Sequence, residues 1–392
     1  MRRLSFSNQT IYPAKSPCGV GADADMTRRS LLAMTTLGAA GSLLHGPAFA
    51  ATAPTLDQTP LQAIAGTKSR RFGSTINLNA LTDPAYGALL AQQCDVFSSE
   101  VGFAWSEISP RAGTAFFKTA DSIVAFAEAQ GARLRGHPLV WDKSLPSDFA
   151  QQLQKTSAVD LMVQHIQTVA GRYGDRIQSW DVVNEAVLPT DGRPDALRIN
   201  PFLTQAGPDY IVEAFKAARA AAPHAELVYN DWVDGYDNNY WAARRTGILK
   251  LLRYLKSKGA PIDAVGLESH LTANMAGFSP KVWAQFCSDI KSLGLVIHVT
   301  ELTVADNLLP ADIPTRDAAV AAWAYQYLSL TLQHGHVGDV IAWGLSDKYS
   351  SLARYSPRPD GLEPRGVAYD DLFRPKPLRK AIAQALSFSP AF

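Results

Sequence analysis

Two glutamates follow apolar stretches that have the character of buried β-strands. Glu185 comes directly after residues 179–184 (SWDVVN), and Glu301 comes directly after residues 295–300 (LVIHVT), 116 positions further on (301 − 185). A lone Asn-Glu pair after a strand is more often a capping or loop feature than a catalytic one. The second strand of the same build favours a functional interpretation, in which two carboxyl groups face one substrate as acid, base or nucleophile.

The elements that must position these glutamates alternate regularly from residue 72 onward. Expected strands cover 73–78, 96–100, 133–140, 177–185, 226–231, 264–270, 295–301 and 339–345. Expected helices cover 84–93, 115–130, 158–172, 209–222, 239–258, 280–293, 316–333 and 378–386, several with Gly or Pro at their ends. Strands rich in Val, Ile and Leu that alternate with helices imply parallel pairing.

This order of elements predicts a single α/β domain over residues 71–392, a (β/α)8 TIM barrel with its chemistry at the carboxyl ends of the strands. A doubly wound open sheet is the alternative, but no GxGxxG turn follows any of the strands.

Polar and aromatic residues lie at or just beyond the ends of seven of the eight expected strands. They include Glu100, His137, Trp141, Asn184, Asn230, Glu268, His270 and Trp343. Indole faces stack on the C–H surfaces of sugars, while carboxylates and amides bind hydroxyl groups. The set therefore predicts a polysaccharide or oligosaccharide substrate, and two glutamates fit cleavage of a glycosidic bond. The sequence predicts no metal centre and no cofactor.

Six motifs, in order and spacing, resemble glycoside hydrolase family 10, the (β/α)8 endo-1,4-β-xylanases. They are RGHPLVW (135–141), WDVVNE (180–185), YND (229–231), SHL (269–271), TEL (300–302) and WGLSD (343–347). The resemblance covers roughly residues 72–388 and implies hydrolysis of a xylan-type polysaccharide by a retaining double displacement. By this resemblance Glu185 is the acid/base and Glu301 is the nucleophile, with carboxyl groups about 5–5.5 Å apart.

The resemblance also assigns roles to the neighbouring residues. Asn184 would bind the 2-hydroxyl of the sugar at the cleavage point, and His270 would orient Glu301. Residues expected to line the substrate are Glu100, His137, Trp141 and Trp343, and those expected to support the site are Asn230, Glu268 and Thr303. The chemistry requires that Glu185 be protonated near neutral pH, so its pKa is expected to be raised.

Several positions depart from the family pattern. They are Val101, Ala104, Asp142, Ser144, Glu268, Thr303 and Ser351, where the family usually has Asn, Lys, His, Gln, Gln, Asp and Trp. The loss of Asn, Lys and Gln removes hydrogen bonds at the sugar one step beyond the cleavage point, each worth about 1–3 kcal/mol. Ser351 in place of Trp opens space where a hexose would carry its hydroxymethyl group.

These departures leave the substrate open. A β-glucanase or β-glycosidase on hexose-containing or decorated glycans is the alternative enzyme. A non-catalytic carbohydrate-binding barrel is the alternative from another class, but such a protein would have no need for both glutamates. Glu268 adds a further question, because a carboxyl group near Glu185 must either be neutral itself or raise the pKa of its neighbour.

The first fifty residues have the pattern of an export signal. Arg28 and Arg29 precede a mildly apolar stretch that ends at Ala48-Phe49-Ala50, which is typical of a twin-arginine signal, and Met26 is a possible true start. Residues 51–70 are expected to form a linker or an N-terminal arm. The sequence therefore predicts a secreted or periplasmic protein that has no membrane segment in its mature form.

Charge and cysteine content limit the possible partners. The 37 Lys and Arg residues nearly balance 36 Asp and Glu residues, which argues against binding to nucleic acid or to an acidic membrane surface. We expect a monomer. Cys94 and Cys287 are expected to be buried free thiols, although one disulfide between them is the alternative.

Overall fold

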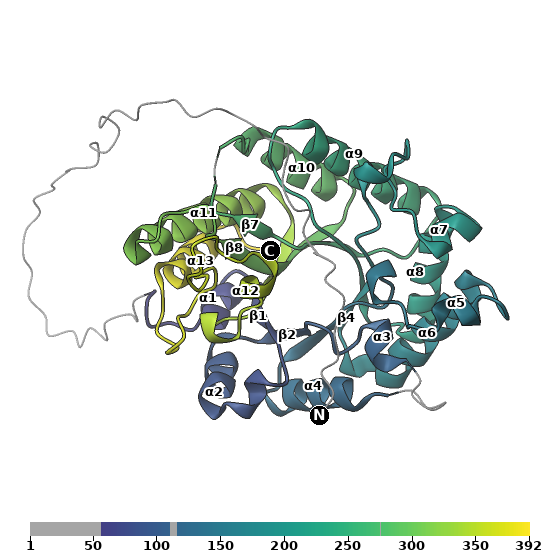
Figure 1. Ribbon diagram of the computed structural model, residues 1–392, viewed down its shortest axis with the longest axis horizontal. Coiled ribbons are helices and arrows are strands. Elements are labelled where there is room, and N and C mark those ends of the chain that lie inside the picture. The colour runs from purple at the N-terminus through teal and green to yellow at the C-terminus, as the bar shows by residue number, and fades with distance from the viewer. Residues whose placement is uncertain (1–55, 110–115, 275) are drawn as a thin grey trace, which may run out of the picture. The chain divides into compact units, whose positions relative to one another are not determined.

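A computed structural model describes residues 56–109, 116–274 and 276–392 of the chain. Eight parallel strands form a closed barrel within residues 56–392 (Figure 1). They are β1 (Arg71–Ile76), β2 (Val96–Ser99), β3 (Arg133–Gly136), β4 (Ser179–Asn184), β5 (Glu226–Asp231), β6 (Ala264–Leu267), β8 (Val296–Ala305) and β9 (Val337–Ala342). Each pairs with its neighbour in sequence, while β6 pairs with β8 and β9 pairs with β1. The predicted (β/α)8 barrel is confirmed.

Helices surround this barrel and connect its strands. The longer ones are α2 (Pro84–Gln93), α4 (Lys118–Ala129), α6 (Ala158–Tyr173), α8 (Asp209–Ala221), α9 (Asn239–Ser257), α10 (Pro280–Ser292), α11 (Ile313–His334) and α13 (Pro377–Phe388). Shorter helices in the connections are α1 (Leu61–Gly66), α3 (Trp105–Ile108), α5 (Phe149–Gln152), α7 (Pro201–Ala206) and α12 (Leu352–Tyr355). The helix expected over 84–93 has these bounds, and the other seven begin and end within three residues of the expected positions.

Local capping explains this agreement. Asp83 accepts a hydrogen bond from the backbone N–H of Ala85 at the start of α2, and Ser157 accepts one from Asp160 at the start of α6. Gly174, with φ +49°, follows the last residue of α6. Asp and Ser side chains accept hydrogen bonds from unpaired N–H groups at the start of a helix. Gly adopts the positive φ that ends one.

Two strands end four residues away from the expected position, whereas the other six begin and end within three residues of theirs. The third strand ends at Gly136 rather than at residue 140, because Pro138 has no N–H to donate to a ladder. Val140 pairs again with Val183 as an isolated bridge. The seventh barrel strand, β8, continues past Glu301 to Ala305, where the short strand β7 (His270–Thr272) pairs with it.

Residues 61–66, within the segment expected to be a linker or N-terminal arm, form α1. Its buried side chains, Leu61, Ile64 and Ala65, belong to the core, and α1 packs against α13. The buried guanidinium of Arg70 then donates to the backbone carbonyl of Val337 at 2.8 Å. The predicted export signal, residues 1–50, lies outside the described residues.

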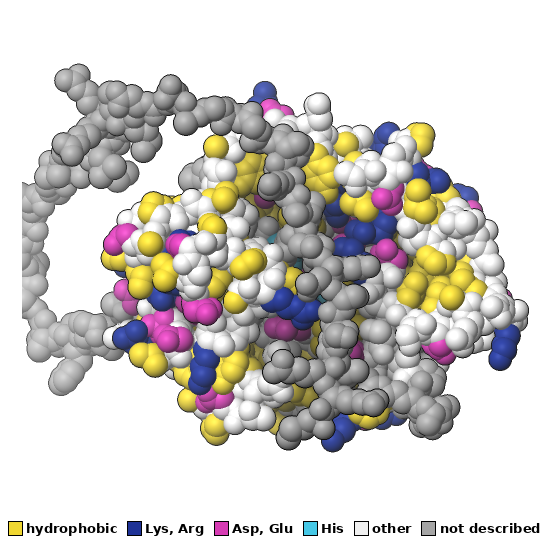
Figure 2. Space-filling model, in the orientation of Figure 1, with side chains coloured by type: hydrophobic (Ala, Val, Ile, Leu, Met, Phe, Trp, Pro, Cys, Tyr) yellow, Lys and Arg dark blue, Asp and Glu magenta, His cyan; other side chains and the backbone are white. Residues whose placement is uncertain are grey.

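The core fills the barrel and the space between barrel and helices. Gly136 illustrates its density, because a Cβ there would lie 2.1 Å from the ring of Trp180, which is fully buried. Cys94 and Cys287 are free thiols and both are buried, which confirms the expectation. No helix among the described residues has the length and apolar character needed to cross a membrane. Figure 2 shows basic and acidic side chains close to one another on the face in view.

Candidate active site

Asn230, at the end of β5, connects the two glutamates. Its side-chain amide donates to Glu301 Oε1 at 2.9 Å and to Asn184 Oδ1 at 2.8 Å. Its amide oxygen accepts from the hydroxyl of Thr300 at 2.7 Å, and its backbone carbonyl accepts from the N–H of Glu185 at 2.9 Å. One fully buried residue, Asn230, therefore holds both Glu185 and Glu301 in place.

The neighbouring strand leaves room for this amide. Gly266 in β6 pairs with Asn230, and a Cβ at position 266 would lie 2.0 Å from Asn230 Oδ1. A larger residue at 266 would displace the side chain that holds the site together.

Glu301 is 5% exposed and is held from two sides. His270 Nε2 lies 2.9 Å from Glu301 Oε2, opposite the bond from Asn230. The other nitrogen of His270, Nδ1, lies 2.9 Å from the hydroxyl of Thr303. The pairing of β8 shifts register between Val299 and Leu302, and such irregularities re-aim side chains next to functional sites.

His137 lies on the opposite side of Glu301. Its Nδ1 is 2.8 Å from Asp181 Oδ2 and 4.0 Å from Glu301 Oε1. Burial opposes a charge on His137, but the carboxylates of Glu301 and Asp181 outweigh it and raise the pKa of the imidazole. The Trp343 ring packs edge-on against both His137 and His270, at centroid distances of 5.6 and 5.9 Å.

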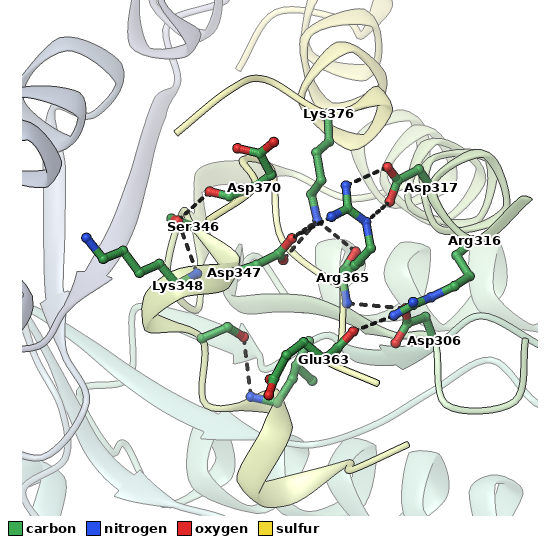
Figure 3. A network of polar contacts seen from close by, with 12 residues as sticks. Asp306, Arg316, Asp317, Ser346, Asp347, Lys348, Glu363, Arg365, Asp370 and Lys376 are labelled. Carbon is green, nitrogen blue, oxygen red and sulfur yellow. Dashed lines mark hydrogen bonds and ion pairs between the residues drawn. The ribbon is translucent and has the colours of Figure 1, made fainter. Parts of the chain in front are cut away.

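A buried polar network braces the segment that follows Trp343 (Figure 3). Lys376 Nζ lies 2.8 and 2.6 Å from the two carboxylate oxygens of Asp347, and it also donates to the backbone carbonyl of Arg365. The guanidinium of Arg365 forms two bonds of 2.8 Å to Asp317 on α11. The loop after β9 is thereby tied to α11, with Trp343 at its base.

Glu185 directly follows β4 and has a backbone φ of +51°, a conformation that L-residues adopt only at a cost of about 1–2 kcal/mol. Its Oε2 accepts from Lys143 Nζ and from Arg198 Nη2, both at 2.8 Å. Burial favours the neutral form, but these two cations outweigh it and lower the pKa of Glu185. The expectation of a raised pKa is therefore wrong for the free protein, because Lys143 and Arg198 were not anticipated.

The loop after β4 turns back to deliver Arg198. Val187 and Leu197 form an antiparallel bridge, and the N–H of Arg198 donates to the carbonyl of Ala186 at 2.8 Å. The Arg198 Nε also donates to the backbone carbonyl of Glu185 at 2.7 Å. Nothing in the local sequence indicates this return, since the pairing joins residues across a long loop. The sequence did contain an indication for Lys143, because it lies only two positions after Trp141, which was expected to line the substrate.

Two further carboxyl groups lie near Glu301. Burial, together with the charges of Glu301 and Glu185, raises the pKa of Glu268 well above its usual range. Burial also raises the pKa of Glu100 to about 7, with a smaller contribution from Glu301. Of the two possibilities stated above, the neutral Glu268 is the one that the structure favours.

The expected site residues all lie around the hydrogen bonds that hold Glu185 and Glu301. Trp141 is half-buried, and the ammonium of Lys143 lies 5.4 Å from the centroid of its ring. Glu268, His270 and Glu301 place one possible ligand atom each within 4.8 Å of one another. Both nitrogens of His270 already have partners in Glu301 and Thr303, so hydrogen bonding accounts for this arrangement without an ion.

A closed (β/α)8 barrel with paired glutamates at its strand ends is the arrangement of a glycoside hydrolase. The Glycosyl hydrolase family 10 model matches residues 60–385, and the chain belongs to this family. Endo-1,4-β-xylanase B of Paenibacillus barcinonensis is 31% identical over 321 residues, which cover 79% of this chain and 93% of that protein.

Solved structures agree with this assignment. The chain resembles native xylanase 10B from Thermotoga maritima with 26% identity and a TM-score of 0.74, over 83% of this chain and 98% of that one. It resembles xylanase 10B from Thermotoga petrophila RKU-1, in complex with xylobiose, with 26% identity and a TM-score of 0.74, over 83% and 97% of the two chains.

Proposed function

We propose that this protein is a retaining endo-β-1,4-glycanase that hydrolyses a xylan-type polysaccharide, with Glu301 as nucleophile and Glu185 as acid/base. The observation that carries the proposal is the double role of Asn230. It holds Glu301 through its side chain and Glu185 through its backbone, so the two carboxyl groups are positioned as one unit.

In the first step a protonated Glu185 donates to the glycosidic oxygen while Glu301 attacks the anomeric carbon. The bond to the leaving sugar breaks, and a glycosyl ester forms on Glu301. In the second step water attacks this ester, and Glu185, now a carboxylate, accepts the proton of the water. Asn230 donates to Oε1 of Glu301, and His270 Nε2 lies 2.9 Å from Oε2, so both oxygens of the nucleophile are held in position for the attack.

The bond from Asn230 also orients Asn184. Because the Oδ1 atom of Asn184 accepts from Asn230, the NH₂ group of Asn184 points away from Asn230. We propose that this NH₂ group binds the 2-hydroxyl of the sugar at the cleavage point. Protonation of Glu185 is the step that Lys143 and Arg198 oppose.

The stereochemistry of the products tests this proposal. Proton NMR of the reaction in the first minutes should show the β-anomer before mutarotation, and Glu301→Ala should give no turnover. Initial formation of the α-anomer would contradict the retaining mechanism. Failure to cleave xylan, mixed-linkage glucan or any aryl β-glycoside would contradict the enzyme itself.

A hexose-containing glycan is the second candidate substrate. Where the family pattern has Asn and Lys, Val101 is 56% exposed and Ala104 is a buried N-cap of α3. Ser144 uses its hydroxyl to bond the backbone carbonyl of Trp141 at 3.1 Å. Comparison of kcat/KM on aryl xylobioside and aryl cellobioside distinguishes the two, and a strict preference for the xyloside excludes the second candidate.

We also propose export through a twin-arginine signal, on the basis of Arg28, Arg29 and the Ala48-Phe49-Ala50 end of the following stretch. Replacement of both arginines by lysine should retain the protein in the cytoplasm, as cell fractionation would show. Unchanged export would contradict this route.

A further inference from the structure

Two basic side chains contact the same oxygen atom of Glu185. Lys143 Nζ and Arg198 Nη2 both lie 2.8 Å from Oε2, and the side chains are 29% and 9% exposed. An acid that must deliver a proton does not need two cations on its oxygen. Their presence at this point therefore calls for a function other than acid catalysis.

Both cations are held by the surrounding chain. Arg198 is fixed by its bond to the carbonyl of Glu185, and its Nε lies 3.6 Å from Asp142 Oδ1. Lys143 lies in a short 3₁₀ turn, Asp142–Ser144, which is closed by the bond from Ser144 N–H to the carbonyl of Trp141. Lys143 is the more exposed of the two, so a bound molecule can reach it.

Other charged groups lie close to this pair. Arg244 on α9 lies near this pair but forms its own buried ion pair with Asp231, and the other nearby acids are Asp142 and Glu268. Burial raises the pKa of both acids, and for Glu268 the charges of Glu301 and Glu185 raise it further. Among the described residues, Glu185 is the carboxylate that contacts both cations, whereas Asp142 contacts only Arg198.

The acid in a glycosidase faces the leaving group, so groups on its oxygen face the leaving sugar. An anion there would share Lys143 and Arg198 with Glu185. The ionised form of Glu185 would lose part of its stabilisation, and the residue would take up a proton from solvent. Substrate binding would then produce the acid that the reaction requires.

We propose that Lys143 and Arg198 recognise a carboxylate on the leaving sugar, so that the preferred substrate is an acidic glycan with a uronic acid residue at this position. The proposal rests on the proposed function. The proton taken up by Glu185 passes to the glycosidic oxygen, the leaving uronate departs with a free hydroxyl, and water later returns a proton to Glu185.

The test uses one uronate-containing β-glycan oligosaccharide before and after chemical reduction of its carboxyl groups to primary alcohols. The two substrates differ only in having a carboxylate or a neutral CH₂OH group at the same positions. A charged hydrogen bond is worth about 1.5–3 kcal/mol, so wild type should show kcat/KM about 10- to 100-fold higher for the acidic form at pH 7. Lys143→Ala should lose most of this preference, and Lys143→Arg should keep more of it.

Lys155→Ala is the matched control, because Lys155 is an exposed lysine outside the site and its loss should leave the preference unchanged. Equal rates on the two substrates, or a preference of Lys143→Ala equal to that of wild type, would overturn the proposal. Dinitrophenyl β-glycosides distinguish failure of the charge preference from failure of the proposed function. Their leaving group departs without a proton, so they need Glu301 as nucleophile but not Glu185 as acid. Wild-type turnover of these, absent in Glu301→Ala, supports the proposed function whatever the charge preference.

Discussion

The side-chain amide of Asn230 donates to Glu301 Oε1 at 2.9 Å, from the position where β5 ends. The same residue accepts the backbone N–H of Glu185. We therefore expect Asn230→Ala to lower kcat by about 10- to 100-fold, because a bond to a charged acceptor contributes about 1.5–3 kcal/mol. Steady-state kinetics on an aryl β-glycoside measures this change.

Asn79→Ala is the control for that variant, since Asn79 is exposed and makes no side-chain cap bond at the start of its 3₁₀ turn. Circular dichroism and thermal unfolding separate a loss of fold from a loss of positioning. A folded Asn230→Ala variant with wild-type kcat would show that the amide is not needed to position Glu301.

Thr303 sets the state of the histidine beside Glu301. If its hydroxyl donates to His270 Nδ1, then Nε2 carries the hydrogen and donates to Glu301, even when the ring is neutral. Thr303→Val keeps the shape and removes the donor. We expect a decrease in kcat of about 5-fold, as for loss of a neutral hydrogen bond of about 1 kcal/mol, with KM little changed. An unchanged kcat would assign Thr303 a packing role only.

Lys143 controls the protonation of Glu185. Its charge favours the ionised form, so its removal favours the protonated form and raises the pKa of Glu185. On a neutral glycoside the alkaline limb of the kcat/KM profile should therefore move to higher pH in Lys143→Ala. Lys155→Ala should leave the limb in place. A shift to lower pH would contradict the stabilisation of the ionised Glu185 by Lys143.

Glu268 should behave as a neutral group. Burial, with the charges of Glu301 and Glu185, raises its pKa well above the usual range, which favours the neutral form. Glu268→Gln replaces one neutral group with another of similar shape and should leave the alkaline limb unchanged. The sequence alone predicts the opposite, a downward shift of that limb, and such a shift would show that Glu268 is ionised.

The fold could be predicted from the sequence because local signals mark most boundaries. Asp83, Ser157 and Gly174 cap or end helices through their own backbone and side-chain chemistry, and apolar stretches mark the strands. The end of β3 was missed although Pro138 was visible, because an apolar pattern continued beyond it. The extension of β8 to Ala305 depends on β7, a pairing between distant segments that periodicity does not reveal.

The site was only partly predictable for the same reason. Asn230, His270 and Glu301 end or follow strands, so the barrel topology brings them together. Arg198 reaches Glu185 through the return of a long loop, which depends on the Val187–Leu197 bridge. The protonation of Glu185 could not be inferred without it, because the pKa depends on the balance of burial against nearby cations.

The assignment of Glu301 as nucleophile is tested most directly by trapping its glycosyl ester. Incubation with a 2-deoxy-2-fluoro β-glycoside that bears a dinitrophenyl leaving group slows the second step, and peptide mass spectrometry then locates the sugar. We expect one adduct, on Glu301, and none in Glu301→Ala. An adduct on Glu185, Glu268 or Glu100, or turnover of this substrate without any adduct, would contradict it.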